Sequence, residues 1–296
     1  MTTTEVLRRF NRTYTQRIGA LDESFLGLGL PLGSARLVFE VGEDGATVRD
    51  LRARLGRDSG QLARQLRRLE DDGLVLVAPD VEDRRRRTVR LTAKGRAFRR
   101  RLDDRSEQLA ERLVAPLTAR QRERLAEALA TADLLVRAAT VEIRSVHPGA
   151  PTAQQAVRSY FDELDARFPG GFDPGDHHDV DHMAPGAGAF VVATSDGEPV
   201  ACGGVQAIGP GVGEIKRMWV HPGWRGAGLG SRLLRHLEEV AVELGHPTVR
   251  LDTNGTLVEA IAMYERAGYR AIERYNDNPY AQAFFEKRVA PVSPRG

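Results

Sequence analysis

The stretch Glu214-Ile-Lys-Arg-Met-Trp-Val-His-Pro-Gly-Trp-Arg-Gly-Ala-Gly-Leu-Gly-Ser231 decides the fold of the second half of the chain. Its alternating first part predicts a strand that ends at Val220, and apolar residues at helical spacing predict a helix from Leu229. Between them lies an R-x-x-G-x-G turn that begins at Arg225. Small residues let backbone N–H groups approach an anion, and the helix N-terminus adds partial positive charge. The turn therefore suits a pyrophosphate, although a plain structural loop can have the same composition.

Length and charge predict two domains. The 296 residues exceed a typical single domain, and the net charge of +2 hides an asymmetry. Residues 1–139 carry 28 Lys+Arg against 21 Asp+Glu, whereas residues 140–296 carry 15 against 20. The first half therefore suits a polyanion and the second does not. We place one domain in each half, with the boundary near residue 139.

Cysteine usage and hydropathy indicate the compartment. Cys202 is the single cysteine, so an intrachain disulfide is excluded and a reducing compartment is favoured. The N-terminus lacks the pattern of a signal peptide, and no apolar run approaches the roughly 20 residues of a membrane span. We expect a cytoplasmic protein with no membrane segment.

The first half carries the pattern of a DNA-binding motif. A short helix from Thr47 ends at Gly56, and a second helix over 59–72 has leucines on one face and Gln and Arg on the other. Strands at 74–78 and 88–92 follow as a hairpin. This order is typical of a helix-turn-helix with a wing. Gln and Arg can read base edges while further arginines neutralise phosphates, but a solvated basic face is the alternative.

The stretches Asp58–Val77, Asp83–Arg85 and Val89–Gly95 resemble a winged-helix regulator of the MarR family. The resemblance implies a mainly α winged helix-turn-helix domain that forms a homodimer and recognises a double-stranded DNA operator. The helical segments 93–115 and 118–138 match the implied dimerisation region. The residues carried over as DNA contacts lie on the second helix and in the wing: Ser59, Gln61, Arg64, Gln65, Arg68, Arg84, Arg85 and Arg86.

Residues 140–296 read as an α/β domain with several antiparallel strands. Four stretches of this domain, in their order along the chain, resemble the motifs of the GNAT N-acetyltransferases. They are Glu214–Ser231, Leu251–Asn254, Ala260–Tyr264 and Ala267–Tyr269. The resemblance implies a mixed, mostly antiparallel sheet and acetyl-CoA as cosubstrate. The residues implied to contact acetyl-CoA are Met218, Trp219, Val220, Arg225, Gly226, Ala227, Gly228, Leu229, Gly230, Ser231 and Asn254.

The implied reaction moves an acetyl group from CoA to an amine. Tyr264 matches the general acid of the family, with core packing as the alternative for a helix tyrosine. Glu214 is the candidate general base, acting through water, although a strand carboxylate can instead orient the substrate. Both roles depend on the resemblance.

The acceptor is harder to infer from the sequence. Lys216 and Arg217 lie beside the expected transfer site, where either could hold a carboxylate. Arg167 and Phe172 precede the loop in which GNAT enzymes usually build the acceptor pocket. We expect a small, amino-acid-like amine, with solvated or salt-bridged cations as the alternative.

A polar loop before Gly188 holds residue types that can bind a metal, but their spacing matches no site that fixes coordination geometry. We therefore expect no metal there. The residues concerned are His177, His178, Asp179, Asp181 and His182.

Together the two halves predict a bifunctional transcriptional regulator and N-acetyltransferase. Two alternatives stay open. The second domain can act only as a sensor of acetyl-CoA for a DNA-binding regulator, or the winged helix can serve only for dimerisation of an enzyme.

Overall fold

The computed structural model describes residues 2–80, 86–173, 175, 181–195 and 197–289. The chain divides into two compact units, Met1–Leu125 and Ala126–Gly296. The division falls inside a helix, α6 (Ala119–Thr140), ahead of the boundary expected near residue 139. The domain boundary itself stays a prediction. Within the described ranges, no helix is long and apolar enough to cross a membrane.

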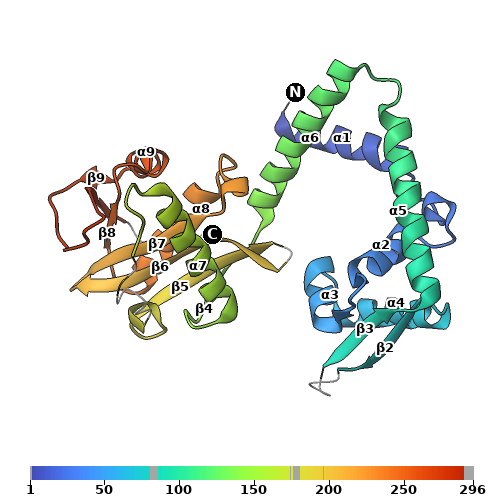
Figure 1. Cartoon of the computed structure of the whole chain (residues 1–296), viewed down its shortest axis with the longest axis horizontal. Coiled ribbons are helices and arrows are strands. Elements are labelled where there is room, and N and C mark those ends of the chain that lie inside the picture. Colours follow the sequence, from blue (N-terminus) through green and yellow to red (C-terminus); the bar gives the residue numbers. More distant parts are fainter. Residues whose placement is uncertain (1, 81–85, 174, 176–180, 196, 290–296) are drawn as a thin grey trace. The chain divides into compact units, whose positions relative to one another are not determined.

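The first unit is a helical domain with a three-stranded antiparallel sheet, ordered β1-β3-β2. Side chains cap its central helices: Thr47 accepts the N–H of Asp50, and Asp58 accepts the N–H of Gln61 at 2.8 Å. Figure 1 shows β2 and β3 as a hairpin beside α4 and the start of α5, which confirms the winged helix-turn-helix. Its described elements are α1 (Thr3–Arg17), η1 (Phe25–Gly27), α2 (Leu32–Val41), β1 (Ala46–Thr47), α3 (Val48–Leu55), α4 (Ser59–Asp71), β2 (Val75–Pro79), β3 (Arg87–Leu91) and α5 (Ala93–Val114).

The second unit is built on a seven-stranded sheet, ordered β4-β5-β6-β7-β8-β10-β9. Every neighbouring pair is antiparallel except β7 and β8, so the expected mixed, mostly antiparallel sheet is confirmed. Its described elements are β4 (Ile143–Val146), α7 (Pro151–Arg167), η2 (Asp181–Met183), β5 (Gly188–Ser195), β6 (Glu198–Gly209), β7 (Val212–Val220), η3 (Pro222–Trp224), α8 (Leu229–Glu243), β8 (Thr248–Thr253), α9 (Val258–Arg266), β9 (Arg270–Ala271) and β10 (Ala283–Arg288).

Helices cover both faces of this sheet (Figure 1). Because side chains alternate along a strand, Phe190 and Val192 of β5 pack with α7, whereas Val191 packs with the leucines of α8. Cys202 of β6 is buried on the α7 side, and burial raises the pKa of its thiol to about 12. The thiol is therefore protonated and packed as a small apolar group.

Strand β7 separates from β8 part-way along its length. The two strands pair in parallel over Val212–Glu214 and Thr248–Arg250. On the other edge, the register with β6 shifts between Cys202 and Gly204, and Arg217 has a left-handed φ of 52°. This bulge bends β7 away from β8, which opens the sheet after Glu214.

The end of α6 belongs to the core of the second unit. Ala138 and Val141 are buried with Trp224, which lies in the turn after β7. Arg232 of α8 donates to the carbonyl oxygen of Ala138 at 2.9 Å. The Arg137 guanidinium lies 4.8 Å from the centre of the Trp224 ring, as in a cation–π contact. The last turns of α6 are thus tied to the glycine turn and to α8.

Candidate functional site

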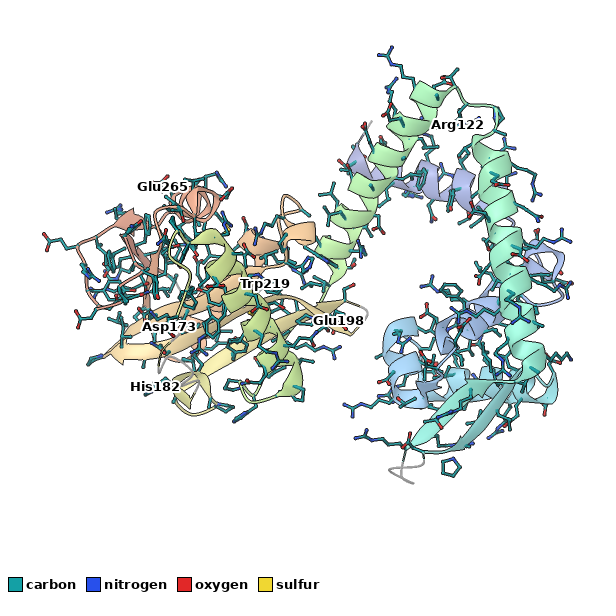
Figure 2. All side chains as sticks on the ribbon, viewed as in Figure 1. Arg122, Asp173, His182, Glu198, Trp219 and Glu265 are labelled. Atoms are coloured by element: carbon teal, nitrogen blue, oxygen red, sulfur yellow. The ribbon has the colours of Figure 1, made fainter. Side chains whose placement is uncertain are left out.

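A cavity of about 670 Å³ lies where β7 and β8 separate. Its floor comes from the two strands, and its walls come from α7, the loop after α7, α9 and the segment 276–280. Figure 2 labels Trp219 of β7 beneath α7, and this side chain is buried between that helix and the sheet. The volume of the cavity is in the range of small-molecule sites, and polar groups converge on the cavity.

A buried charge cluster forms the floor of the cavity. The Lys216 ammonium lies 2.9 Å from Oδ1 of Asp252 and 3.4 Å from Oε1 of Glu214. Asn276 donates to both carboxylates at 3.1 Å, and Asn278 donates to Oδ2 of Asp252 at 2.6 Å. The cluster therefore holds two carboxylates for one ammonium.

Asp252 and Lys216 hold each other ionised. Burial alone would raise the pKa of Asp252, but the Lys216 ammonium and hydrogen bonds from Lys216, Asn278 and Asn276 keep it below its usual value. Burial alone would lower the pKa of Lys216, but Glu214 and Asp252 outweigh it and raise that pKa. Lys216 was one of two candidates to hold a substrate carboxylate, with a salt-bridged cation as the alternative. It lines the cavity and forms ion pairs with Glu214 and Asp252.

Glu214, the candidate base, is 3% exposed and fixed in orientation. Its Oε1 accepts the Tyr275 hydroxyl at 2.8 Å and the Asn276 amide, while its Oε2 accepts Nε2 of Gln206 at 2.8 Å. Burial and the Glu214 charge raise the pKa of Tyr275, so that phenol remains a donor. Glu214 lines the cavity as expected, within a network that restrains both of its oxygens.

Tyr264, the candidate acid, lies on α9 and lines the same cavity. Burial raises the pKa of Tyr264, and the negative charge of Asp252 raises it further, so the phenol is protonated at neutral pH. Tyr160 of α7 also lines the cavity, and burial together with Tyr264 raises its pKa. The cavity therefore carries two protonated phenols near the acidic floor.

The open edge of β7 bears the first expected cosubstrate residues. Met218 lines the cavity, at a point where β7 no longer pairs with β8. Trp219 points to the opposite face and donates Nε1 to Glu163 at 2.9 Å, so its side chain is not available to a ligand in the cavity. The carbonyl oxygen of Val220 accepts Nε of Arg225 at 3.0 Å. Backbone groups, more than side chains, are what this edge offers.

The glycine turn has the geometry of an anion site. Gly226 and Gly228 have φ of 78° and 81°, a conformation that glycine adopts without strain. Gly228 caps α8, and Arg232 donates the first helical bond to its carbonyl at 3.1 Å. The N–H groups of residues 229–231 therefore lie free of helical partners at the start of α8. Gly230 packs closely, since an added Cβ would lie 3.2 Å from Sδ of Met263.

Two expected ligand contacts have other partners. Arg225 directs its guanidinium to Glu163 of α7, with Nη2 2.5 Å from each carboxylate oxygen. Arg167 donates to Glu163 at 3.2 Å and to Glu259 of α9 at 3.4 Å, and it does not line the cavity. Burial would raise the pKa of Glu163, but its bonds to Arg225, Trp219 and Arg167 hold it below its usual value.

Of the remaining expected residues, Asn254 has protein partners for its amide, whereas Phe172 and Arg217 line the cavity. Asn254 borders the cavity, but its amide donates to the carbonyl of Tyr280 at 2.8 Å and accepts two bonds from Thr256. Phe172 and Arg217 both line the cavity. Sequence reasoning missed Asp252 and the segment 276–280. Asp252 could have been found as the carboxylate of the alternating strand Thr248–Thr253, directly before Asn254, whereas nothing local marks the segment.

Five of the expected DNA contacts lie together on α4. Ser59, Gln61, Arg64 and Arg68 are exposed, and Gln65 is half-buried. A hollow of about 250 Å³ on this surface is lined by Arg57, Gln61, Arg64, Gln65 and Arg68. Arg86 is exposed at the start of the second wing strand, and Arg84 and Arg85 lie outside the described residues.

The polar loop before Gly188, considered above as a metal site, lies mostly outside the described residues. His177, His178 and Asp179 are among the residues that are not described. In the part of the chain that is described, no three His, Cys, Asp or Glu side chains gather as a metal site.

Comparisons with known proteins match both halves. Residues 157–269 match the acetyltransferase (GNAT) family, and residues 28–86 match the MarR family. The chain is 36% identical over 120 residues to an IAA acetyltransferase of Azospirillum brasilense, which covers 39% of this chain and 78% of that relative. The chain belongs to the GNAT acetyltransferase family and carries a MarR-family domain in its first half.

Two further similarities cover one half each. An uncharacterised N-acetyltransferase of Schizosaccharomyces pombe is 35% identical over 97 residues, or 32% of this chain; the chain spans 60% of that relative's length. A MarR-family transcriptional regulator from Rhodococcus sp. RHA1 is similar in structure, with a TM-score of 0.37, 20% identity, and coverage of 44% of this chain and 94% of the regulator.

Membership of the GNAT and MarR families confirms the expected pairing of an acetyltransferase fold with a winged helix. The GNAT fold implies use of an acyl-CoA and a small-molecule acceptor. The MarR family implies DNA binding and, typically, dimers.

Proposed function

We propose that the protein is a DNA-binding transcriptional regulator and an acetyl-CoA-dependent N-acetyltransferase that acetylates a small amine. The observation that carries the proposal is the opening of β7 from β8, where a free strand edge and the buried phenol of Tyr264 border one cavity. The glycine turn follows this strand in the chain. The buried Cys202, as the single cysteine, fits a cytoplasmic location.

The donor site fits acetyl-CoA at two places. Backbone N–H groups at residues 229–231 suit the pyrophosphate, and the unpaired edge of β7 near Met218 suits the amide groups of pantetheine. When bound, acetyl-CoA supplies a thioester: the amine nitrogen bonds to its carbonyl carbon while the carbon–sulfur bond breaks and leaves its electron pair on sulfur.

The residues of the chain manage the protons. A protonated amine gives up two protons on becoming an amide. One passes to solvent through water held at Glu214, and the other replaces the proton that Tyr264 gives to the departing sulfur. The raised pKa of Tyr264 suits this role because the phenol must carry its proton before the transfer.

The acceptor we propose is amino-acid-like, and Arg217 is the cation that supports this. It lines the cavity, and its guanidinium lies 5.7 Å from the centre of the Phe161 ring. Lys216 also lines the cavity, where it pairs with Glu214 and Asp252. Arg167 pairs with Glu163 and Glu259 and does not line the cavity.

For the regulatory half we propose operator binding by a homodimer. Helix α1 buries no residue within this chain, and Val6, Leu7, Phe10 and Tyr14 are exposed on it. Such a row of apolar side chains supports a contact with a second copy. Each α4 would then read one half of a DNA operator from the major groove.

The test of the enzymatic half is CoA release from acetyl-CoA with a panel of amines. We expect turnover with at least one primary amine, and loss of turnover in Tyr264→Phe. Tyr14→Phe provides a control, because it makes the same chemical change in the first unit and keeps the ring that the proposed contact with a second copy uses. Binding of acetyl-CoA without turnover of any amine would contradict the proposal and leave a sensor.

A further inference from the structure

We infer that the acceptor amine is carried on a flat aromatic body, which stacks on a wall of rings in the cavity while its ammonium faces the two carboxylates of the floor. The inference rests on the proposed acetyl transfer and narrows its acceptor. The aromatic wall consists of Phe161, Phe168, Phe172 and Tyr280.

The rings of the wall touch one another and all line the cavity. Phe172 lies 4.8 Å from Tyr280 and 5.4 Å from Phe161, measured between ring centres, and Phe168 lies 5.8 Å from Tyr280. Aromatic pairs at such separations favour offset or edge contacts. A further ring can extend the cluster by the same geometry, whereas an alkyl chain gains only from the area that it buries.

The wall is fixed by hydrogen bonds from its own loops. The Phe172 N–H donates to Asp165 at 2.9 Å, and the Asp173 N–H donates to the hydroxyl of Tyr280 at 2.9 Å. Gly171, with a φ of 75°, turns the chain so closely that an added Cβ would lie 2.8 Å from the Asp165 carboxylate. The rings are therefore held in place without a ligand, which reduces the entropy lost on binding.

The opposite side of the cavity is anionic. Asp252 and Glu214 share the single ammonium of Lys216, so the floor has one more carboxylate than ammonium, and Arg217 lines the cavity as a second cation, 5.7 Å from the centre of the Phe161 ring of the aromatic wall. An ammonium group complements the extra carboxylate of the floor. Asn278 joins the two sides, because its amide donates to Asp252 and its Oδ1 accepts the N–H of Tyr280 at 3.1 Å. An acceptor with a ring at one end and an ammonium at the other matches both surfaces.

The test compares three amines with different bodies: 2-phenylethylamine, 2-cyclohexylethylamine and n-octylamine. CoA release gives kcat/KM for each on the full chain with acetyl-CoA. We expect 2-phenylethylamine to exceed 2-cyclohexylethylamine by at least tenfold. Phe172→Leu should remove most of this preference while changing kcat/KM for n-octylamine by less than about threefold.

Two substitutions of Tyr280 distinguish the contribution of its ring from that of its hydroxyl. Tyr280→Phe keeps the ring and should retain the preference for the aromatic amine, whereas Tyr280→Leu should lose it. Melting temperature verifies that each variant is folded. Equal kcat/KM for the three amines, or equal losses for all of them in Phe172→Leu, would overturn the inference and leave the proposed acetyl transfer standing.

Absence of turnover with any amine would instead reject the proposed function. Calorimetric titration of the CoA complex with the same amines then judges the acceptor class on its own. Tighter binding of 2-phenylethylamine than of 2-cyclohexylethylamine supports the aromatic wall, and equal binding overturns it.

Discussion

Removal of the Lys216 ammonium is the sharpest test of the buried charge cluster. Lys216→Met keeps most of the length of the side chain and leaves the carboxylates of Glu214 and Asp252, each 4% exposed, without their cation. Breaking a buried ion pair by removing one partner typically costs about 3–5 kcal/mol. Because Lys216 is 29% exposed, we take the lower end, about 3 kcal/mol.

The cost should depend on pH. In the native cluster the pKa of Asp252 is lowered, so its stabilisation is present at neutral pH and is lost as pH falls through its folded pKa. The pKa of Lys216 is raised, so its stabilisation is lost only as pH rises through its folded pKa. Without Lys216, burial raises the pKa of Asp252, and protonation relieves the penalty. Lys216→Met should therefore be more destabilising at pH 7 than at pH 5.

Calorimetric melting of the full chain measures this effect. For a unit of this size, about 3 kcal/mol corresponds to a fall in Tm of roughly 6–12 °C. The double variant Lys216→Met/Asp252→Asn removes one carboxylate charge and should recover much of the loss. The control Arg144→Met breaks an exposed pair with Glu142 and should cost under about 1 kcal/mol. A fall in Tm below 2 °C at pH 7, or no recovery in the double variant, would refute the reasoning.

Three further predictions concern catalysis, cosubstrate binding and DNA. Tyr264→Phe should lower kcat by about 100-fold or more and leave the Kd of acetyl-CoA within about threefold, as measured by steady-state kinetics and calorimetry. Gly228→Ala, at a φ of 81°, should raise the KM for acetyl-CoA at least tenfold. Gly245→Ala, at a φ of 86° beyond the other end of α8, is the control and should leave this KM unchanged. Equal effects of the two substitutions would indicate backbone strain alone. Arg64→Ala should weaken DNA binding and reduce the salt slope by about 1 in fluorescence anisotropy, while Arg112→Ala on α5 should leave both unchanged.

The parts of the fold that the sequence predicted are those with local causes. Gly56 ends α3, Asp58 caps the start of α4, and the leucines of α4 pack inward at helical spacing. The R-x-x-G-x-G turn needs its glycines for left-handed backbone, and this requirement is visible in the letters alone. Tyr264 and Phe172 reach the cavity because their motifs fix their position on α9 and after α7.

The parts that the sequence did not predict depend on pairings between distant segments. Lys216 meets Asp252 because β7 and β8 start in parallel register at Val212 and Thr248 and then separate. Arg225 meets Glu163 because α7 packs over the strand that leads into the turn. The sequence could therefore place Lys216 and Arg225 near the predicted site, but it could not identify the carboxylates with which they pair.

The continuity of α6 has a practical consequence for dividing the protein. A fragment that begins at residue 140, where the family resemblance begins, lacks Ala138 and Arg137 and so uncovers Trp224 and the N-terminal half of α8. A fragment that begins near residue 126 keeps these contacts. Purification of the acetyltransferase half by itself therefore requires the part of α6 from about residue 126 onward, although a match to the GNAT family alone would place the start of the fragment after this helix.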